Sequence, residues 1–553
     1  MASSEKLKTL VDFFYHWESK QPEKVFLNQP FGNEWRETTW GEAGQQARKL
    51  ATYLNSLGLP PKTNIGLISK NCAEWMIADM AILMSGHISV PFYATLTDEQ
   101  INQVLVHSGC PVVFIGKLDD WNGMKAGIPE GTTCISFPKY NPDPTHVQWD
   151  DIMANYAPQK GNFVPDLDDV FTIVYTSGTT GNPKGVVLTH RALAVVVEDT
   201  KEMLLHNHPN TRFFSYLPLC HVAERNLVEV TSIASGGTIY FAESLESFAK
   251  NLAIANPTHF LAVPRIWTKF QQGILGKMPQ KKLDLFLKIP ILNNIVKKKI
   301  RTGLGLNDVK LVLTGAAPMP ASLIQWFRKL GINIQEAYGM TENLGAVCMM
   351  PPNKTKDGTV GKIYNGVEVK LAEGTGEILM RSGWIMQGYY KEPNITADTI
   401  RDGWLHTGDV GELDEEGYLK ITGRVKEIYK TTKGEYIAPS PIEFGFADNN
   451  FIDQICVAGQ SLPQPIALIV LSDIARKADR EEVMQSLKET VDALNPKLKS
   501  HERIKKVVVM NEPWTIDNNM LTPTMKIKRS IIEKNFEPKM ESWYEEKGTV
   551  VWA

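Results

Sequence analysis

The chain is organised around the stretch Tyr175-Thr176-Ser177-Gly178-Thr179-Thr180-Gly181-Asn182-Pro183-Lys184-Gly185. Residues 170–174 before it and 186–190 after it are apolar runs typical of short β-strands, so this stretch is predicted to be a hairpin-like loop. It holds five hydroxyls, three glycines and one lysine. Glycines let backbone N–H groups approach a ligand, and the hydroxyls and Lys184 add neutral donors and a positive charge. This inventory suits a polyphosphate.

Two other interpretations of the loop have to be weighed. Clusters of Ser, Thr and Gly between strands are usually solvated loops. The stretch is also not a Walker A motif, because that motif places a glycine directly before its lysine and Pro183 occupies this position. The loop alone therefore leaves phosphate binding open.

Composition sets broad limits on the class of protein. The chain has 553 residues, enough for two to four domains, and its 43% hydrophobic and 22% charged content is ordinary for a globular protein. A net charge of −3 gives no sign of nucleic-acid binding. The six cysteines are scattered without a C-x-x-C pair, which favours a reducing compartment over a disulfide framework or zinc site.

The apolar windows do not predict a membrane span. The longest, Trp75 to Pro91, is interrupted by Asp79 and His87. No secretory signal peptide is recognised at the N-terminus. The expectation is a cytoplasmic protein, with peripheral membrane association and the choice between monomer and homodimer left open. A basic run from Lys281 to Arg301 is predicted to be a solvated helix face, with a membrane surface or the phosphates of coenzyme A as alternative partners.

Strand and helix patterns alternate as far as about Ile334, which predicts an α/β protein with parallel-type sheets covered by helices. Residues 357–420 are rich in glycine with short strand patterns and are predicted to form an antiparallel β subdomain. We therefore expect a large N-terminal domain over residues 1–425, built from two parallel-type sheets and this subdomain. A small α+β domain is expected over residues 426–553.

Several further strings carry chemically useful residues, although each has an ordinary structural interpretation when taken alone. A His after a Leu-Pro-Leu turn is usually packed, an Asp after Gly is common in turns, and a basic tail is usually solvated. The strings are Ser215–Arg225, Leu311–Pro318, Ile334–Glu342, Asp402–Asp409, Thr422–Lys430 and Leu521–Arg529.

The order of these strings, together with T-S-G-T-T-G-x-P-K-G in the loop, resembles the adenylate-forming (AMP-binding) superfamily of acyl-CoA synthetases, luciferases and adenylation domains. The segments Ser69–Trp75, Ala81–Tyr93 and Val263–Trp267 look most like the long-chain fatty acyl-CoA synthetase branch. The resemblance covers about residues 8 to 535. It implies a large domain and a small mobile domain joined by a hinge at Lys426.

The resemblance also implies the site. Thr176 and Glu342 would hold Mg²⁺, His221 would position the substrate carboxylate, and Lys526 would be the catalytic lysine, with Lys528 as the alternative register. Met525 stands where the family usually has glycine before this lysine. ATP would be bound by Thr176, Ser177, Gly178, Thr179, Thr180, Gly181, Lys184, Gly315, Ala316, Ala317, Glu336, Ala337, Tyr338, Gly339, Thr341, Asp409, Arg424, Lys426, Lys430 and Lys526. By the same resemblance the turn at 315–318 would line the adenine pocket, Tyr338 would stack on adenine, and Asp409 would bind the ribose. Gly434 would lie at the crowded point of a hairpin that enters the site for thioester formation.

The implied enzyme is an AMP-forming acid–thiol ligase with ATP, Mg²⁺ and coenzyme A. It would activate a carboxylic acid, a medium- to long-chain fatty acid by branch resemblance, as the acyl adenylate and transfer it to coenzyme A. An acyl-AMP ligase that loads a carrier protein or another acceptor stays open, as does a catalytically silent acyl- or nucleotide-binding homologue. The joint presence of Lys526, Glu342, Asp409 and Arg424 speaks against the silent homologue.

Overall fold

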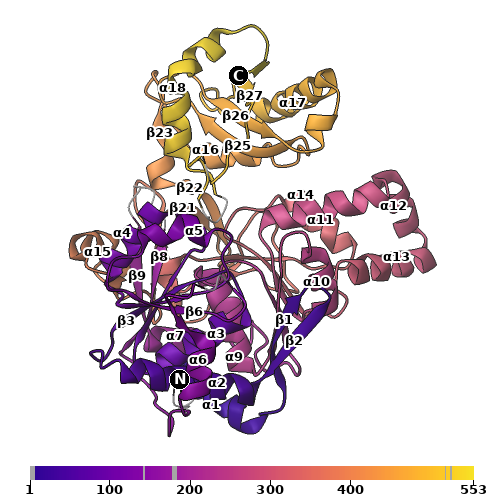
Figure 1. Cartoon of the computed structure of the whole chain (residues 1–553). Helices are drawn as coiled ribbons and strands as arrows, with labels where there is room; N and C mark the ends of the chain where they lie inside the picture. The colour runs from indigo at the N-terminus through magenta and orange to yellow at the C-terminus, as the bar shows by residue number, and fades with distance from the viewer. Residues whose placement is uncertain (1–6, 141–142, 177–182, 517, 523–525) are drawn as a thin grey trace.

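The structure, a computed structural model, describes residues 7–140, 143–176, 183–516, 518–522 and 526–553. Two large mixed sheets and an antiparallel sheet make up a large body, and the elements from β23 onward form a smaller body above it (Figure 1). The predicted fold class is confirmed. No helix in the described residues is long and apolar enough to cross a membrane.

The first large sheet has eight strands and contains the predicted hairpin. Six of its strands run parallel, and β9 and β19 extend it in antiparallel fashion. In order across the sheet the strands are β19 (Gly388–Tyr389), β9 (Lys184–Thr189), β8 (Val170–Thr176), β4 (Ile88–Phe92), β3 (Asn64–Ile68), β5 (Val112–Ile115), β6 (Thr133–Ser136) and β7 (Val147–Gln148).

The second large sheet has nine strands, parallel in the middle and antiparallel at both edges. Its strands, in order, are β16 (Lys362–Ile363), β15 (Cys348–Met349), β14 (Gln335–Tyr338), β13 (Leu311–Thr314), β12 (His259–Leu261), β10 (Arg212–Ser215), β11 (Thr238–Phe241), β1 (Val25–Phe31) and β2 (Glu34–Thr39). The carboxyl ends of β13 and β14 meet at one edge, because neighbouring parallel strands end on the same side.

Helix α3 (Ala73–Met84) joins the two sheets into one core. All twelve of its residues are buried, Glu74 and Asp79 among them, so the helix lies wholly inside the core. Its core cluster includes side chains from both large sheets. The other helices of the large body, apart from three described next, are α1 (Leu10–Lys20), α2 (Trp40–Ser56), α4 (Asp98–Ser108), α5 (Trp121–Met124), α6 (Trp149–Asn155), α7 (His190–Thr200), α8 (Val222–Glu224), α9 (Thr231–Ser235), α10 (Phe248–Ala255), α14 (Ala321–Lys329) and α15 (Pro393–Thr399).

Three consecutive helices, α11 (Pro264–Lys277), α12 (Gln280–Lys288) and α13 (Pro290–Gly303), form an arm. In Figure 1 helices α12 and α13 lie side by side and extend to the right of the main body. Prolines 264 and 290 occupy the first turns of α11 and α13, where the missing N–H costs nothing.

The antiparallel sheet extends beyond the predicted range. Its strands are β17 (Val367–Leu371), β18 (Glu377–Ser382), β20 (Ile400–Arg401), β21 (Trp404–Leu413) and β22 (Leu419–Arg424). Residues 357–420 also supply β16 and β19 to the two larger sheets. The stretch is therefore shared among three sheets rather than set apart from them.

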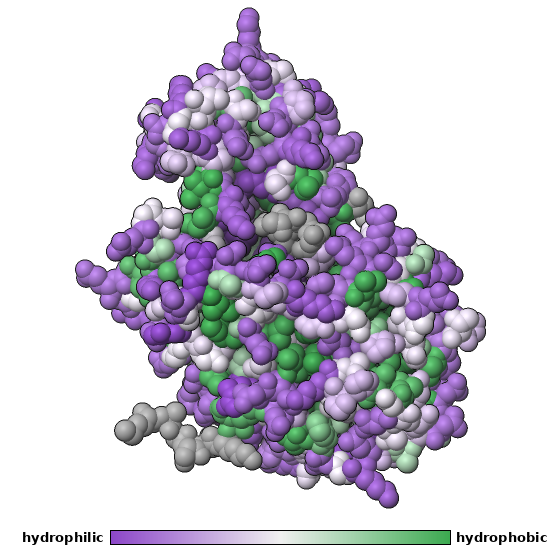
Figure 2. Space-filling view, turned by 90° about the vertical axis from the view of Figure 1, so that its left-hand side faces the viewer, coloured by the Kyte–Doolittle hydropathy of each residue, from purple (hydrophilic) through white to green (hydrophobic). Residues whose placement is uncertain are grey.

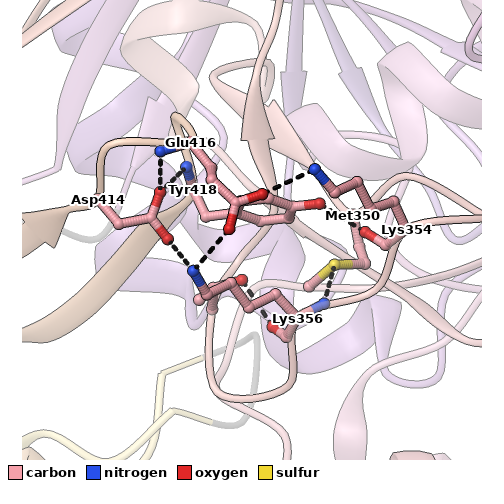
Figure 3. Close-up of polar contacts among 7 residues, drawn as sticks. Met350, Lys354, Lys356, Asp414, Glu416 and Tyr418 are labelled. Carbon is pink, nitrogen blue, oxygen red and sulfur yellow. Dashed lines mark hydrogen bonds and ion pairs between the residues drawn. The ribbon is translucent and has the colours of Figure 1, made fainter.

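Polar contacts tie this sheet to the loop that follows β15 (Figure 3). Lys354 Nζ lies 2.7 Å from Glu416, Lys356 Nζ lies 2.5 Å from Asp414, and the Tyr418 hydroxyl donates to the Lys354 carbonyl oxygen at 2.6 Å. Exposed pairs of this kind contribute little energy each. Together they fix the β21–β22 hairpin relative to β14, and both elements carry predicted site residues.

The smaller body has a four-stranded sheet flanked by helices, which confirms the predicted α+β class. Its elements are β23 (Tyr429–Lys430), β24 (Tyr436–Ile437), α16 (Pro439–Phe444), β25 (Ile452–Ala458), β26 (Ile466–Leu471), α17 (Arg480–Leu494), β27 (Lys506–Val509), α18 (Arg529–Glu545) and β28 (Val550–Trp552). Figure 2 shows it as a separate lobe, with a notch between the two bodies. Arg265 and Asp453 bridge the bodies with an ion pair of 3.0 Å.

Candidate active site

The open end of the β8–β9 hairpin brings a hydroxyl and an ammonium together. Thr176 ends β8 and pairs with Lys184, the first residue of β9. The Lys184 ammonium lies 5.4 Å from the centre of the Tyr389 ring. The predicted phosphate-binding residues between them, Ser177, Gly178, Thr179, Thr180 and Gly181, lie outside the described residues.

Glu342 lies beside this corner in a short 3₁₀-helix, η3 (Thr341–Asn343), that packs against β9. Its carboxylate and the Thr341 side chain are buried, each residue being 8% exposed. The Tyr389 hydroxyl donates to Glu342 Oε1 at 2.7 Å. Burial raises the pKa of Glu342, and this hydrogen bond counteracts the rise. Tyr389 thus touches both the carboxylate and the lysine of the corner.

These residues fit a magnesium ion bound together with a nucleotide. A carboxylate has about four acceptor positions, so the bond from Tyr389 leaves Glu342 able to ligate a cation. Proteins hold Mg²⁺ with one or two carboxylates plus substrate phosphates. A nearby cation would also stabilise the charged form of a carboxyl whose pKa burial has raised.

A turn of small residues follows β13. Ala316 has φ of +64°, a left-handed conformation that costs a non-glycine residue about 1 kcal/mol or more and is concentrated at ligand sites. Ala316 and Ala317 are exposed. A Cβ at Gly315 would lie 2.9 Å from the carbonyl oxygen of Ala337 on β14. The turn therefore presents bare backbone beside β14, as the predicted adenine pocket requires.

Strand β14 and the residue after it complete this wall. A Cβ at Gly339 would lie 2.1 Å from the carbonyl carbon of Gly345, so only glycine fits where the two backbone segments cross. Burial, with a smaller contribution from Asp357, raises the pKa of Glu336 to about 8. Glu336 therefore holds its proton at neutral pH and can both donate and accept a hydrogen bond.

Asp409 is the point where three elements meet. It lies on β21 opposite Arg424 on β22, and Arg424 Nε donates to its Oδ1 at 2.7 Å. The hydroxyl of Tyr338, at the end of β14, donates to its Oδ2 at 2.7 Å. Each oxygen keeps a second acceptor position, which would suit two vicinal hydroxyls. The predicted base-stacking ring and the predicted ribose ligand are therefore directly joined.

Lys526 reaches this site from the smaller body. It lies close enough to Arg424 and Asp409 for both to affect its pKa: burial lowers that pKa, Arg424 lowers it further and Asp409 raises it. The residue is exposed by its accessible surface, although burial is the largest of these effects on its pKa. The alternative lysine, Lys528, instead donates to Asn519. The structure thus brings Lys526 to the nucleotide-facing residues of the large body.

His221 is also near Lys526. Burial and the positive charge of Lys526 lower its pKa to about 4, so the imidazole is neutral at physiological pH. Its Nδ1 accepts the backbone N–H of Ala223 at 3.2 Å. A neutral ring that accepts at Nδ1 carries its proton on Nε2. His221 therefore has an N–H donor available for a carboxylate.

Three predicted nucleotide or hinge residues are not brought into this group. Lys426 is exposed in a 3₁₀ turn, η4 (Val425–Glu427). Lys430 lies on the β23–β24 hairpin, 5.5 Å from the ring of Tyr436. Gly434, at φ +85° in the turn of that hairpin, has only the Lys430 side chain near a built Cβ, at 3.8 Å. The expected crowding at Gly434 is therefore absent from this arrangement of the described residues.

Comparison with known protein families gives two matches that span most of the chain. The model of the AMP-binding enzyme matches residues 14–390, and the model of the AMP-binding enzyme C-terminal domain matches residues 427–548. The chain belongs to the AMP-binding enzyme family. This confirms the predicted superfamily. The first match ends at residue 390 and the second begins at residue 427, so residues 391–426 lie between them.

Relatives of this AMP-binding enzyme point to one branch of the family. A long-chain-fatty-acid–CoA ligase of Mycobacterium bovis is 28% identical over 96% of both chains. Fatty acyl-CoA synthetase A of Dictyostelium discoideum is 28% identical over 93% of this chain and 86% of its own. These names are those of the long-chain fatty acyl branch that the sequence predicts.

Solved structures agree in fold. An anthranilate CoA ligase in complex with anthranoyl-AMP has a TM-score of 0.78 at 19% identity, covering 97% of this chain and 98% of its own. A didomain of the carboxylic acid reductase from Segniliparus rugosus, in complex with AMP, has a TM-score of 0.81 at 20% identity over 98% of this chain and 83% of its own.

The sequence did not identify two residues of this AMP-binding enzyme that hold other side chains in place. Tyr389 bonds Glu342 across 47 positions of sequence. Arg529, at the start of α18, pairs with Glu443 at 2.8 Å and with Glu427 at 3.5 Å. The one feature that could have drawn attention to Tyr389 is the aromatic pair that follows Gly388. Nothing in the neighbouring sequence connects this pair to Glu342, the predicted magnesium ligand.

Proposed function

We propose that this AMP-binding enzyme is a fatty acyl-CoA synthetase. It would join a long-chain fatty acid to coenzyme A in two steps, with ATP cleaved to AMP and pyrophosphate. A carboxylate oxygen attacks the α-phosphorus and the bond to the β-phosphate oxygen breaks, which releases pyrophosphate. The thiol of coenzyme A then attacks the acyl carbon, and AMP leaves.

The single observation that carries the proposal is the position of Lys526. It comes from the smaller body, yet it is near enough to Asp409 and Arg424 of the large body for their charges to affect its pKa. A cation at that position can interact with the α-phosphate and the attacking carboxylate at the same time. Such preorganised charge is typically the largest contribution to catalysis of this kind of transfer.

The other residues have separable roles in the first step. Asp409 would accept from the ribose hydroxyls, Thr341 would donate to the α-phosphate, and His221 would donate its Nε2 proton to the carboxylate. Glu342 and Thr176 would hold Mg²⁺, which neutralises charge on the phosphate oxygens when bound. The pairing of Lys184 with Thr176 places a positive charge and a hydroxyl at the same end of the hairpin. We propose that this end binds the phosphates that leave as pyrophosphate.

The second step requires Lys526 to withdraw. We propose that the smaller body turns about Lys426, and that the β23–β24 hairpin with Lys430 and Gly434 enters in its place. Lys430 lies instead beside Tyr436 of its own hairpin, which supports this alternation, because a hairpin used in the second step should not contact the nucleotide site during the first.

The function is tested by measuring pyrophosphate release from ATP. Saturated acids of increasing chain length are compared, each with and without coenzyme A. The expected result is release that depends on both acid and coenzyme A, with long chains preferred, and formation of the acyl thioester. Adenylate formed without turnover by coenzyme A, but discharged by a phosphopantetheinyl carrier protein, would favour the carrier-loading ligase. No acid-dependent release with any chain length would indicate a silent binding protein.

A further inference from the structure

The tip of the helical arm exposes apolar side chains to an unusual degree. Leu285, Ile289, Ile291 and Ile295 are 57%, 41%, 75% and 56% exposed. These are four of the fourteen exposed large hydrophobic side chains in the described residues, and they lie within eleven positions. Single exposed apolar residues are normal on a protein surface, whereas a group of them marks a surface that binds something apolar.

These four side chains are not the packing face of the arm. Helices α12 and α13 pack through Leu283 and Val296, which are buried in the same cluster as side chains of β10, β12 and β13 in the middle of the nine-stranded sheet. The arm is therefore already supported on its inner side, and the exposed residues form a second apolar surface on the outer side and around the tip.

The same surface is strongly cationic. Residues 264–303 contain ten lysines and arginines and one acid, Asp284, although the whole chain carries a net charge of −3. In the described part of the chain, the only ion pair made by this segment joins Arg265 to Asp453, at the base of the arm. The charges nearer the tip are therefore not neutralised by the protein.

Apolar and cationic groups alternate along the exposed helix faces. Ile291, Ile295 and Lys298 are spaced four and three residues apart, which places them on one face of α13. Lys281, Leu285 and Lys288 repeat that spacing on α12. Long lysine stems beside apolar residues are the pattern of helices that lie in the interface of a membrane.

We propose that the arm tip, defined as Lys281–Lys299, docks on a bilayer that contains anionic phospholipid. Ile289, Ile291 and Leu285 would enter the boundary between headgroups and acyl chains, and the lysines would face the phosphates. The choice of a lipid surface over an apolar protein groove rests on charge complementarity, because the exposed residues join bulky aliphatic groups to a dense positive charge.

Docking of the arm would also bring the acyl site near a bilayer that dissolves the fatty acid. This step of the inference rests on the proposed function. We take residues 258–267, which include the Val263–Trp267 string typical of the fatty acyl branch, to line the acyl site. Helix α11 starts within this segment at Pro264, and Trp267 in its first turn is fully buried. Its fourteen residues span about 21 Å. A docked tip would hold the acyl site at about that distance from the lipid that dissolves its substrate.

Co-flotation of the full-length protein with vesicles tests the docking without any need for catalysis. One vesicle preparation is phosphatidylcholine alone, and the other contains one quarter phosphatidylglycerol. We expect binding to the anionic vesicles only, and its loss in high salt. Each lysine near an anionic surface contributes about fivefold, so Lys281→Gln/Lys288→Gln/Lys298→Gln should weaken binding roughly a hundredfold.

A second variant tests the apolar contribution. Ile291→Ser/Ile295→Ser should weaken binding roughly tenfold, because it removes two side chains that would be buried in the headgroup region. Matched control variants change equally exposed residues elsewhere and should bind like wild type. They are Leu245→Ser/Ile254→Ser and Lys477→Gln/Lys499→Gln/Lys539→Gln.

Three outcomes would overturn the proposal. They are equal binding to both vesicle types, no binding to either, and loss of binding in the control variants equal to that in the arm variants.

Light scattering after gel filtration tests the competing occupant, a second copy of the chain. A dimer that dissociates in Ile291→Ser/Ile295→Ser would assign the surface to that second copy. Unchanged coenzyme A-dependent turnover of a short, water-soluble acid shows that the arm variants are folded. Absence of turnover in the wild type with every acid tested, long chains included, would count against the proposed function and leave the vesicle result standing.

Discussion

Replacing Lys526 with alanine separates the two half-reactions of the proposed synthetase. In the structure the charges of Arg424 and Asp409 both act on its ammonium: burial and Arg424 lower its pKa, and Asp409 raises it. A positive charge about 4 Å from charge developing in the transition state, in surroundings of effective dielectric constant about 20, contributes about 4 kcal/mol. Loss of one such preorganised group typically costs about 10²–10³ in rate.

We therefore expect Lys526→Ala to slow acyl-adenylate formation roughly a hundred- to a thousandfold. Thioester formation from supplied acyl adenylate and coenzyme A should stay within a factor of about three, because Lys526 would have left the site by then. Single-turnover measurement of each half-reaction, with quenched samples analysed for acyl adenylate and acyl thioester, gives both rates.

The matched control is Lys528→Ala, which removes the neighbouring lysine that bonds Asn519. It should leave both half-reactions close to wild type, and thermal unfolding should show that both variants are folded. Equal loss of the two half-reactions in Lys526→Ala would refute the assigned role. A larger adenylation defect in Lys528→Ala than in Lys526→Ala would assign the catalytic role to Lys528 instead.

Three other changes test separate parts of the site. Tyr389→Phe removes the hydrogen bond to Glu342 but keeps the ring at Lys184, so the Mg²⁺ concentration for half-maximal ATP binding, measured by calorimetry, should rise roughly tenfold. Lys426→Pro stiffens the hinge, so quenched single turnovers should show slower thioester formation while adenylate formation persists. Burial raises the pKa of Glu224 to about 8, so this carboxyl contributes stability below about pH 4.3 that is lost as the pH rises through 8. Glu224→Gln should therefore flatten the fall in Tm over that range.

Each change has a control in the same neighbourhood or of the same chemistry. Tyr390→Phe removes the next hydroxyl, which accepts from Asn64, and should leave the Mg²⁺ dependence unchanged. Lys426→Ala keeps the backbone flexible and should preserve the thioester step. Glu415→Gln changes an exposed carboxyl and should leave the pH slope of Tm unaltered. An unchanged Mg²⁺ dependence in Tyr389→Phe, an unchanged thioester rate in Lys426→Pro, or parallel Tm slopes in Glu224→Gln would contradict the corresponding assignment.

Local patterns were enough to predict the frame of the molecule. The apolar runs on both sides of residues 175–185 became β8 and β9, paired as the predicted hairpin. Their sequence shows this because a buried strand needs only a short apolar run between turn residues. The motif strings likewise predicted residues such as Tyr338 and Asp409, which the structure joins by a hydrogen bond.

Contacts between distant residues could not be predicted in the same way. Asp79 interrupts the apolar window of α3, and its partner Arg225 comes from a π-helical segment 146 residues further along the chain. Arg225 also pairs with Glu229, and all three residues are buried. Burying a charge without a partner is costly, so the sequence demands a partner for Asp79 but does not identify it. Only the tertiary fold determines which distant cation fills that need.

The proposed hinge at Lys426 would let one fold serve two reactions. On one side of Lys426, Arg424 is anchored to Asp409 of the large body at 2.7 Å. On the other side, Glu427 is paired with Arg529 of the smaller body at 3.5 Å. Rotation can therefore be confined to the two residues between these ion pairs, Val425 and Lys426.

This confinement links the proposed hinge to Lys526, the proposed catalytic lysine. Arg529 lies three residues after Lys526, so the pair with Glu427 fixes the far side of the hinge to the same segment that carries the lysine. A turn at Lys426 would consequently displace Lys526 as part of a rigid body and not by local rearrangement. Because Arg424 stays with Asp409, the nucleotide-facing pair would remain in place while the group opposite it is exchanged. The adenylate can then keep its position between the two steps, which is what transfer of a reactive intermediate without release requires.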